Sequence, residues 1–571
     1  MNFSHRTRRC LCGLAVVALL SGSNASFAGN DAGRGAGNGA GSGAGDAADT
    51  AMATIHPEAI RADMRFLSDD LLEGRGTATR GHELAAKFMA TQFESLGLEP
   101  AGDNGTYFQN VPLRSMRPDT SKTTFTLTRG GKEETLVFGQ DYIAPGDPVR
   151  ADTSVEAPVV FVGFGVTAPE QGYDDYKGVD VKGKIVALVS GAPNFASSLK
   201  AHYSSAEVKR ENAVAHGAVG SIGLDTPSLE QRYPFSKFAR DATHPQFRWL
   251  DKQGRPNGYF PELQGNASLS LPAAKKFFEG APQTADEVFA AVKAGKPASF
   301  ALPITVRIHN VTTLADAHSP NVVAKLTGSD PLLRGEYLVY TAHLDHLGIG
   351  TPVAGDSIYN GALDNASGSA TLLELARAFS SMNPRPRRSI LFVSVTGEEM
   401  GLLGSGYFAR YPTVAKSSIV ADVNTDEDLM LWPMQDIIAF GAEHSTLDGV
   451  IRRATERLHL TYSPDPLPEE VIFIRSDQYS FVKEGIPAVM PSPGFSSSDP
   501  KIEPMAIFQK WEETRYHQPQ DDMDQPGLDF DAAAQYVRFA FLCGYFITED
   551  AQRPTWNRGD FFGQHYGSKS N

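Results

Sequence analysis

Acidic residues and histidines follow directly after apolar, strand-like segments in the second half of the sequence. Three such segments each lead into candidate ligands: His343 and Asp345 after YLVYTA, Glu398 and Glu399 after ILFVSVTG, and Asp426 after IVADVNT. In an α/β sheet, functional groups gather beyond the carboxyl ends of the strands, so these side chains are expected to converge. Each residue taken singly has an ordinary explanation as a cap, a solvated charge or a surface histidine. Together they predict a site.

Two further positions complete this set. Asp364 stands in GALDNASG, before a helix-like segment that begins at Ala366, and His517 follows Tyr516 in a polar loop before the last helix. Converging carboxylates repel one another and need a cation. Histidine and carboxylate ligands without thiolate suit zinc in a catalytic site. Five candidates are too many for one tetrahedral ion but suit two zinc ions that share a carboxylate, bridge a hydroxide and polarise a scissile carbonyl.

The order of these motifs resembles a known family. HLD, GALDNASG, TGEE, NTD and YH occur in this order in the co-catalytic zinc exopeptidases, which include aminopeptidase Y, the bacterial leucyl aminopeptidases and glutamate carboxypeptidase II. LLEGRGTATRGHELAAKF is similar to that family's amino-terminal region, and residues 151–304 are similar to its protease-associated insert. The resemblance implies a three-layer α/β/α domain with a mixed central sheet, plus an inserted β-rich domain.

The resemblance also implies a ligand set for two Zn²⁺ ions per chain. His343 and Asp426 would bind one zinc ion, Glu399 and His517 would bind the other, and Asp364 would bridge both.

Roles in catalysis are implied as well. Glu398 would be the general base, taking a proton from the bridging water and passing it to the leaving amine. Asp345 would orient the imidazole of His343. Tyr516 would donate a hydrogen bond to the developing oxyanion, or would pack beside the ligand loop. Arg475, together with Asp426, would contact polar groups of the substrate, with a structural ion pair as the alternative for Arg475.

The implied activity is that of a zinc-dependent aminopeptidase acting on peptides with a free N-terminus. The alternatives are a zinc carboxypeptidase or dipeptidase on the same scaffold, or a non-catalytic binding protein. A glutaminyl cyclase keeps a single zinc ion and would not need the histidine of HLD, so His343 favours two ions. A strongly acidic site suits a terminal ammonium better than a terminal carboxylate, which requires cationic residues.

Two departures and one backbone feature qualify the resemblance. Gln478 stands in RSDQY where the family has the histidine of an RSDH run. The long loop at residues 493–514 is expected to shape the substrate pocket, with its aromatic residues and Met505 forming an apolar wall. The family also implies a cis peptide bond between Asp364 and Asn365.

Length and composition set the domain organisation. A chain of 571 residues is too long for one compact domain. We expect a peptidase domain in two segments, 53–150 and 305–550, around the insert at 151–304, with a C-terminal tail at 551–571. The net charge of -15 argues against non-specific binding to nucleic acid or anionic membrane.

The first 28 residues are typical of a signal peptide, which predicts an exported protein, periplasmic or secreted. They combine clustered arginines at 6, 8 and 9, an apolar run at 11–20 and the small residues Ser26 and Ala28. A twin-arginine signal is the alternative to an ordinary secretory signal. Residues 29–52, rich in Gly and Ala, are expected to be a flexible linker. Removal of the signal would leave Cys543 alone, so no intrachain disulfide is expected.

Overall fold

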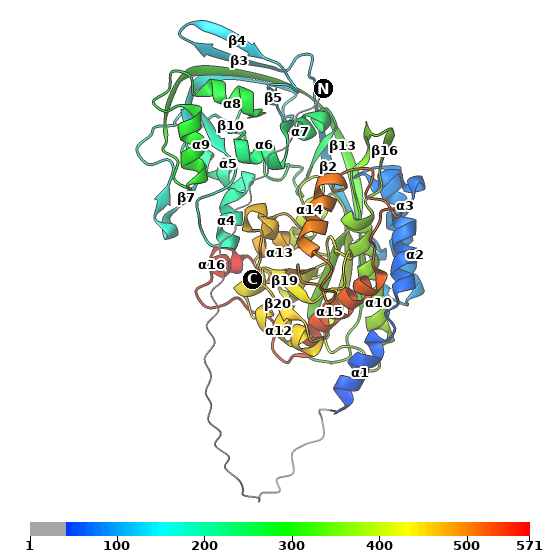
Figure 1. Ribbon diagram of the computed structural model, residues 1–571. Coiled ribbons are helices and arrows are strands. Elements are labelled where there is room, and N and C mark those ends of the chain that lie inside the picture. The colour runs from blue at the N-terminus through cyan, green and yellow to red at the C-terminus, as the bar shows by residue number, and fades with distance from the viewer. Residues whose placement is uncertain (1–41, 571) are drawn as a thin grey trace, which may run out of the picture. The chain divides into compact units, whose positions relative to one another are not determined.

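A mixed β-sheet forms the centre of the larger part of the molecule (Figure 1). The computed structural model describes residues 42–570, and the chain forms one compact unit from Asp46 onward. Four neighbouring strands of the central sheet are parallel. Strand β13 runs antiparallel to its neighbours β2 and β17, and β19 runs antiparallel to β21 but parallel to β20. The strand order is β11 (Gln246–Trp249), β2 (Phe108–Pro118), β13 (Phe300–Leu326), β17 (Ser389–Val395), β14 (Tyr337–His343), β18 (Ile419–Asn424), β21 (Ala488–Pro493), β19 (Asp436–Phe440) and β20 (Thr461–Tyr462).

Helices cover both faces of this sheet because its strands are apolar on both sides. Tyr340 and Phe392 pack into one core together with Phe379 of a covering helix. Leu391, the residue before Phe392, points into a separate core on the opposite face. The predicted α/β fold with a mixed central sheet is therefore confirmed. The helices of the first face are α2 (Pro57–Leu67), α3 (Arg80–Ser95), α10 (Gly368–Ser381), α12 (Leu447–Arg457) and α15 (Phe530–Glu549); those of the second are α11 (Leu403–Arg410), α13 (Gln478–Lys483) and α16 (Phe561–Tyr566).

A second sheet with its own core forms what we call the insert lobe, residues 119–311. Strand β13 belongs to both sheets: its first half pairs with β3 and β6 of the lobe, and its second half pairs with β2 and β17 of the central sheet. The strand order in the lobe is β4 (Lys132–Leu136), β3 (Thr124–Arg129), β13, β6 (Asp152–Phe161), β9 (Ile185–Val189), β10 (Gly220–Leu224), β12 (Gly265–Leu269) and β5 (Tyr142–Ile143).

The lobe begins earlier than the sequence indicated. The predicted boundary at residue 151 left β3, β4 and β5 in the peptidase domain, but all three pair within the lobe sheet. Phe125 and Tyr142 are buried in the lobe core. The strand pattern of this segment carries no local sign of which sheet it joins, because its partner residues lie more than a hundred positions downstream. The lobe helices are α4 (Ser197–Ser204), α5 (Ala206–Ala215), α6 (Pro227–Arg232), α7 (Phe235–Asp241), α8 (Leu271–Phe277) and α9 (Ala285–Lys293).

The ends of the described chain are more ordered than expected. Residues 42–52, placed by the sequence in the linker, form helix α1 (Ser42–Met52), and Ala48, Ala51 and Met52 are buried in the main core. Alanine favours helix, which explains the difference. In the predicted tail, α16 buries Phe562 and Tyr566. The proposed signal peptide, residues 1–28, lies outside the described residues.

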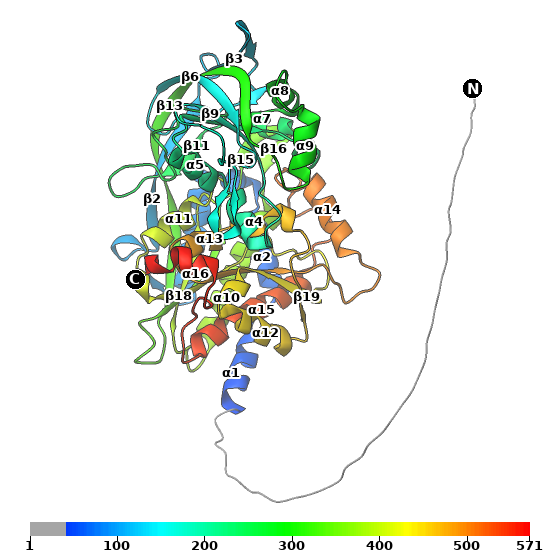
Figure 2. The same ribbon diagram turned by 90° about the vertical axis from the view of Figure 1, so that its left-hand side faces the viewer.

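The view in Figure 2, at a right angle to the first, shows α4 of the lobe extending toward α16 of the central-sheet part. Within residues 42–570, no helix has the length and apolar character needed to cross a membrane.

Candidate metal centre and substrate cavity

The predicted ligands lie together at the carboxyl ends of the parallel strands. His343 ends β14, and the neighbouring strands β17 and β18 pair with β14 on either side. Glu399 and Asp426 follow those two strands. Asp364 comes from a helical turn that leads into α10, and His517 follows α14 (Pro504–Thr514). Segments far apart in sequence thus bring five ligand candidates to one edge of the sheet.

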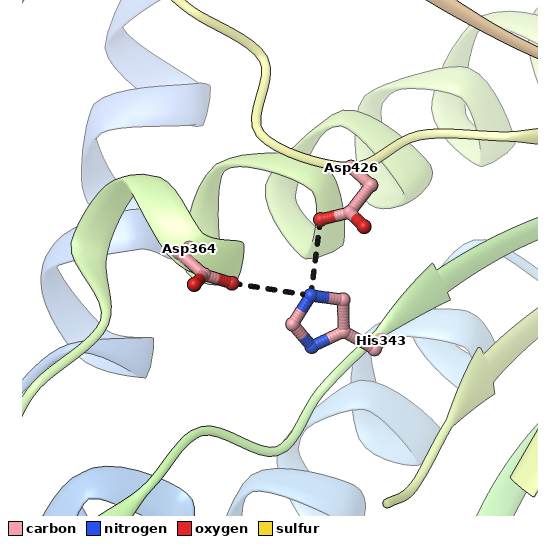
Figure 3. Close-up of side chains that lie close together, drawn as sticks. All are labelled: His343, Asp364 and Asp426. Atoms are coloured by element: carbon pink, nitrogen blue, oxygen red, sulfur yellow. Dashed lines mark hydrogen bonds and ion pairs between the residues drawn. The ribbon is translucent and has the colours of Figure 1, made fainter. Parts of the chain in front are cut away.

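His343, Asp364 and Asp426 form the first group (Figure 3). His343 Nε2 lies 3.0 Å from Asp426 Oδ1 and 3.3 Å from Asp364 Oδ1. All three side chains are buried. Ligand atoms about 2.0–2.1 Å from one tetrahedral zinc ion are about 3.3–3.4 Å apart, so the spacing fits zinc.

His517 and Glu399 face the other oxygen of the same aspartate. His517 Nε2 lies 3.2 Å from Asp364 Oδ2 and 3.2 Å from Glu399 Oε2. The two carboxylate oxygens of Asp364 therefore face different groups, the arrangement that a carboxylate shared by two ions requires. The peptide bond between Asp364 and Asn365 is cis, as the resemblance implies.

The electrostatics of the cluster favour positive charge. Burial lowers the pKa of His517, but Glu399 and Asp364 outweigh burial and raise that pKa to about 10. Burial likewise raises the pKa of Glu399, but His517 and His346 lower it to about 2. Without an ion, the histidines would have to be protonated to balance the carboxylates. Zinc would supply that charge, and the donor set of imidazole and carboxylate fits it.

The backbone of Asp345, rather than its carboxylate, contacts the predicted ligand His343. His343 Nδ1 is 3.0 Å from the main-chain carbonyl of Asp345 but 4.0 Å from its Oδ1. The carboxylate instead accepts hydrogen bonds from the Thr77 hydroxyl (2.9 Å) and the Glu398 backbone N–H (3.2 Å). The residue expected to orient the imidazole thus contacts it through its main-chain carbonyl, with its carboxylate farther away. The chain turns after β14, which brings the carbonyl toward His343 and aims the carboxylate at the segment that carries Glu398.

Glu398 lies at the wall of the cavity beside this cluster. Burial raises its pKa well above the ordinary value; His343 opposes this effect, and Asp426 and Glu399 add to it. A carboxylate in such surroundings binds a proton more readily than one in water, as a general base must.

Two further residues, not selected from the sequence, hold the loop that carries Asp364. Oδ1 of Asp521 accepts a hydrogen bond from the backbone N–H of Leu363, and its Oδ2 accepts one from that of Asp364, each at 3.0 Å. The buried Arg75 donates to the carbonyl of Gly361 at 2.9 Å. Arg75 belongs to the LLEGRG segment that carries the family resemblance, whereas Asp521 had no motif to mark it.

The cavity next to the metal cluster has about 880 Å³ of open space. Part of its wall is apolar, as expected for the loop at 493–514, but Met505 is not among the lining residues. The apolar lining residues include Leu429, Ile438, Phe440, Met490, Phe495, Phe508 and Trp511.

Arg475 and Tyr516 line this cavity and contact each other. Arg475 Nη2 donates a 3.0 Å hydrogen bond to the Tyr516 hydroxyl, and Arg475 Nη1 lies 3.6 Å from Glu470 Oε2. Tyr516 also stacks on His517, with 3.9 Å between ring centroids. The insert lobe reaches this corner, because Tyr233 at the end of α6 donates to Glu470 at 2.6 Å and accepts from Arg475 at 3.3 Å.

Two more residues of the site were not predicted. His346, three positions after His343, is fully buried and forms a candidate metal group with Asp364 and Glu399. Glu427, which follows Asp426, lines the cavity. Each of these two residues directly follows a recognised motif, HLD or NTD. That position in the sequence is the feature by which they could have been predicted to belong to the site.

The sequence of this half of the chain matches a known peptidase family. Residues 321–541 match the model of peptidase family M28. These residues are a peptidase family M28 domain. The match confirms the family that the order of the motifs indicated, and it spans every predicted metal ligand.

Individual relatives match over shorter stretches. A probable zinc metalloprotease of Leptosphaeria maculans is 31% identical over 132 residues, which are 23% of this chain and 27% of that protein. Mouse aminopeptidase NAALADL1 is 33% identical over 129 residues, 22% of this chain and 15% of the relative. The chain thus spans less than a third of the length of these curated relatives.

A solved structure shares the fold over most of the chain. The aminopeptidase from Aneurinibacillus sp. strain AM-1 superposes with a TM-score of 0.52 and 19% sequence identity. The superposition covers 89% of this chain and 97% of that one. The α/β arrangement around the M28 domain is therefore shared with a known protein.

Proposed function

We propose that this chain is a zinc-dependent aminopeptidase that removes residues from the free amino terminus of peptides. The observation that carries the proposal is that Asp364 directs one carboxylate oxygen toward His343 and the other toward His517. In this proposal His343, Asp364 and Asp426 hold one zinc ion, and Asp364, Glu399 and His517 hold a second. When bound, the two ions supply an activated water and polarise the scissile carbonyl.

Glu398 moves the proton in this proposal. Its carboxylate takes a proton from the attacking water as the new C–O bond forms and the carbonyl oxygen becomes an oxyanion. It then passes that proton to the leaving amine when the oxyanion collapses and the peptide C–N bond breaks. The hydrogen bond from its backbone N–H to Asp345 fixes the segment that carries it. Tyr516, whose hydroxyl accepts from Arg475, would donate its own proton to the developing oxyanion in this proposal.

The charge of the cavity supports an amino-terminal substrate. Arg475 is the only lysine or arginine among the described lining residues, and its guanidinium already contacts Tyr233, Glu470 and Tyr516. The one such cation that a terminal carboxylate could contact among these residues is therefore already paired with other side chains. A terminal ammonium would meet acidic side chains, which beyond the metal cluster and Glu398 are Glu427, Asp465, Glu470 and Glu512. The apolar part of the wall suits a hydrophobic first side chain.

The experiment compares aminoacyl-nitroanilides with free and acetylated amino groups, before and after zinc is removed by a chelator. We expect hydrolysis of leucyl-nitroanilide, no hydrolysis of its acetylated form, and recovery of activity when zinc is added back. Equal hydrolysis of both forms would exclude an aminopeptidase. Cleavage that requires a free carboxyl terminus instead would assign the carboxypeptidase or dipeptidase alternative, and no zinc-dependent hydrolysis at all would favour a binding protein.

Export and the insert lobe belong to the same proposal. The arginines and the apolar run within residues 1–28 support export to the periplasm or the medium. The insert lobe would act as a protease-associated domain that covers one side of the cavity, a role supported by the contact of Tyr233 with Arg475 and Glu470.

A further inference from the structure

A second cavity lies in the insert lobe, and among the described residues it shares no lining side chain with the cavity beside the metal cluster. It has about 520 Å³ of open space, which is within the range of small-molecule sites. Strands β6, β12 and β13 of the lobe sheet line it, together with helix α5 and strands β2 and β11. The proposed peptidase function makes no use of this cavity.

Two half-buried arginines, Arg210 of α5 and Arg248 of β11, line this cavity. Burial lowers the pKa of both groups, and the charge of Arg210 helps to lower the pKa of Arg248 to about 10. Arg248 Nη1 donates a 2.9 Å hydrogen bond to the carbonyl of Phe247, and Nε of Arg210 is buried with no hydrogen-bond partner among the described residues. Two like charges therefore act on each other here, and a buried donor is left over.

The carboxylates near these arginines are paired with other cations. Asp147, which also lines the cavity, accepts hydrogen bonds from Nε and Nη2 of Arg150 at 2.9 and 2.6 Å. Glu207, the acid whose charge acts on both lining arginines, lies 3.1 Å from Nζ of Lys483. The basic side chains thus outnumber these carboxylates, and the cavity carries an excess of positive charge.

Oxygen atoms without partners form a second polar part of the lining. Thr153 of β6 and Asn310 of β13 are paired in the sheet, so their side chains lie on the same face, and they are only 7% and 5% exposed. Thr153 Oγ1, Asn310 Oδ1 and Asn266 Oδ1 are buried without a hydrogen-bond partner among the described residues. Buried polar atoms normally have a partner, so these oxygens indicate a ligand that donates hydrogen bonds.

We propose that this cavity binds a small anion that carries hydroxyl groups, of the class of sugar phosphates and sugar acids. The guanidinium groups of Arg210 and Arg248 would bind the phosphate or carboxylate, whose geometry matches their donors. The hydroxyl groups would donate to Thr153, Asn266 and Asn310. One ligand thus accounts for both observations, because its charge offsets the repulsion between the arginines and its hydroxyl groups supply the missing donors.

The wall of this cavity is held in place by the lobe itself. Arg150, which is paired with Asp147, also donates to the carbonyls of Pro261 and Leu263 at 3.3 and 3.5 Å. Its guanidinium lies 5.7 Å from the ring centroid of Tyr259. The loop that contributes Tyr259 and Leu263 to the lining is therefore fixed, so that little conformational entropy is lost when a ligand binds.

Calorimetric titration of the full chain with glucose 6-phosphate, glucuronate and glucose tests the proposal. We expect a sugar anion to bind more tightly than glucose, which has the hydroxyl groups but no charge. The tighter of the two anions identifies the charged group of the ligand as phosphate or carboxylate. The proposal is wrong if neither anion binds at millimolar concentration, or if glucose binds equally well.

The variants Arg210→Gln and Arg248→Gln locate the binding, since anions could also contact zinc ions in the metal cluster. We expect each variant to bind the sugar anion about 10-fold or more weakly, because a hydrogen bond to a charged group contributes at least that factor. Thr153→Val should weaken the sugar anion but not inorganic phosphate, which has no sugar hydroxyl groups to donate. Arg452→Gln is the control, because Arg452 is exposed and pairs with Asp448 outside this cavity. Unchanged affinity in both cavity variants would overturn the proposal.

Thermal unfolding without added ligand gives a readout that does not depend on the choice of probe. If the two arginines serve a ligand, removing one of them relieves their repulsion, and the Tm of Arg248→Gln should equal or exceed that of the wild type. If they serve the fold instead, Arg248→Gln should melt well below both the wild type and Arg452→Gln. That second result would overturn the proposal while leaving the peptidase function intact.

Discussion

The buried guanidinium of Arg75 donates a 2.8 Å hydrogen bond from Nε to the carbonyl of Leu344, the residue between His343 and Asp345. The same side chain donates to the carbonyls of Asn360 and Gly361, just before the loop that carries Asp364. Burial lowers the pKa of Arg75 to about 10, although nearby acids led by Asp345 oppose this effect. Arg75 therefore ties two ligand-bearing loops together and balances part of their negative charge.

We expect Arg75→Met to destabilise the protein strongly. The substitution leaves several buried carbonyls without a donor and removes a cation from an acidic region, changes that typically cost about 3–5 kcal/mol when one partner of a buried charged network is lost. Thermal unfolding with zinc present measures the effect. Arg80→Met is the control, because Arg80 is exposed and its ion pair with Glu73, at 3.8 Å, lies at the surface. Similar melting temperatures for both variants would show that the buried contacts of Arg75 contribute little.

We expect Glu398→Gln to lose turnover while keeping both zinc ions. Glutamine preserves the shape of the side chain but cannot accept the proton, so kcat should fall by about 10²–10⁴-fold, the usual contribution of general acid–base catalysis. Zinc analysis and steady-state kinetics on a peptide nitroanilide check this. The control is Glu513→Gln on the exposed face of α14, which should behave as wild type. A near-normal kcat in Glu398→Gln would show that Glu398 is not the general base.

Asp521 holds Asp364 through its backbone, so we expect Asp521→Asn to weaken zinc binding without removing a ligand. An amide can accept only through its one oxygen and would place an NH₂ group near the backbone N–H of Leu363 or Asp364. We expect zinc affinity to fall by about 10–100-fold, measured by chelator competition. The exposed Asp524→Asn serves as the control. If the two variants bind zinc equally well, the geometry of this loop does not depend on Asp521.

The metal cluster could be predicted from the sequence because its residues come from short motifs at strand ends. Glu399 and Asp426 each follow an apolar strand directly, and the order of the strands in a parallel sheet brings their ends together. The general α/β architecture followed from the same alternation of apolar strands and helices.

Other features depended on contacts that no local pattern reveals. Arg75, which donates to the carbonyl of Leu344, lies 269 residues before it in the chain. Strand β3 likewise pairs with a segment of β13 that lies nearly two hundred positions later. The contact of Asp345 with His343 through its main-chain carbonyl could not be predicted, because side-chain direction after a strand depends on the turn that follows, which spacing alone does not determine.

The insert lobe should influence substrate binding through Tyr233. Removing its hydroxyl in Tyr233→Phe takes away the hydrogen bond to Glu470 and the acceptor for Arg475, so Arg475 becomes less fixed at the cavity wall. We expect KM to rise several-fold, with a smaller change in kcat, consistent with roughly 1 kcal/mol per hydrogen bond. Tyr203→Phe is the matched control, because its hydroxyl bonds to Glu170 within the lobe. An unchanged KM for Tyr233→Phe would show that the insert lobe does not influence substrate binding through Tyr233.

His444 makes the stability of the C-terminal segment depend on pH. Its Nδ1 lies 2.6 Å from Oδ2 of Asp560, the residue that caps α16, and its Nε2 lies 3.2 Å from Glu443 Oε1. Burial lowers the pKa of His444, but these carboxylates outweigh burial and raise it from 6.5 to about 9. The folded state therefore binds this proton more tightly than the unfolded state does.

The sign of the effect follows from this difference in pKa. The stabilisation is fully present below about pH 6.5 and is lost as the pH rises through about 9. We expect it to amount to about 1–3 kcal/mol, because each unit of pKa difference corresponds to about 1.4 kcal/mol. Thermal unfolding from pH 6 to 10 should show a steeper loss of Tm in the wild type than in His444→Gln, which lacks the titrating group. Parallel Tm profiles for the two proteins would mean that the proton on His444 does not stabilise the packing of α16.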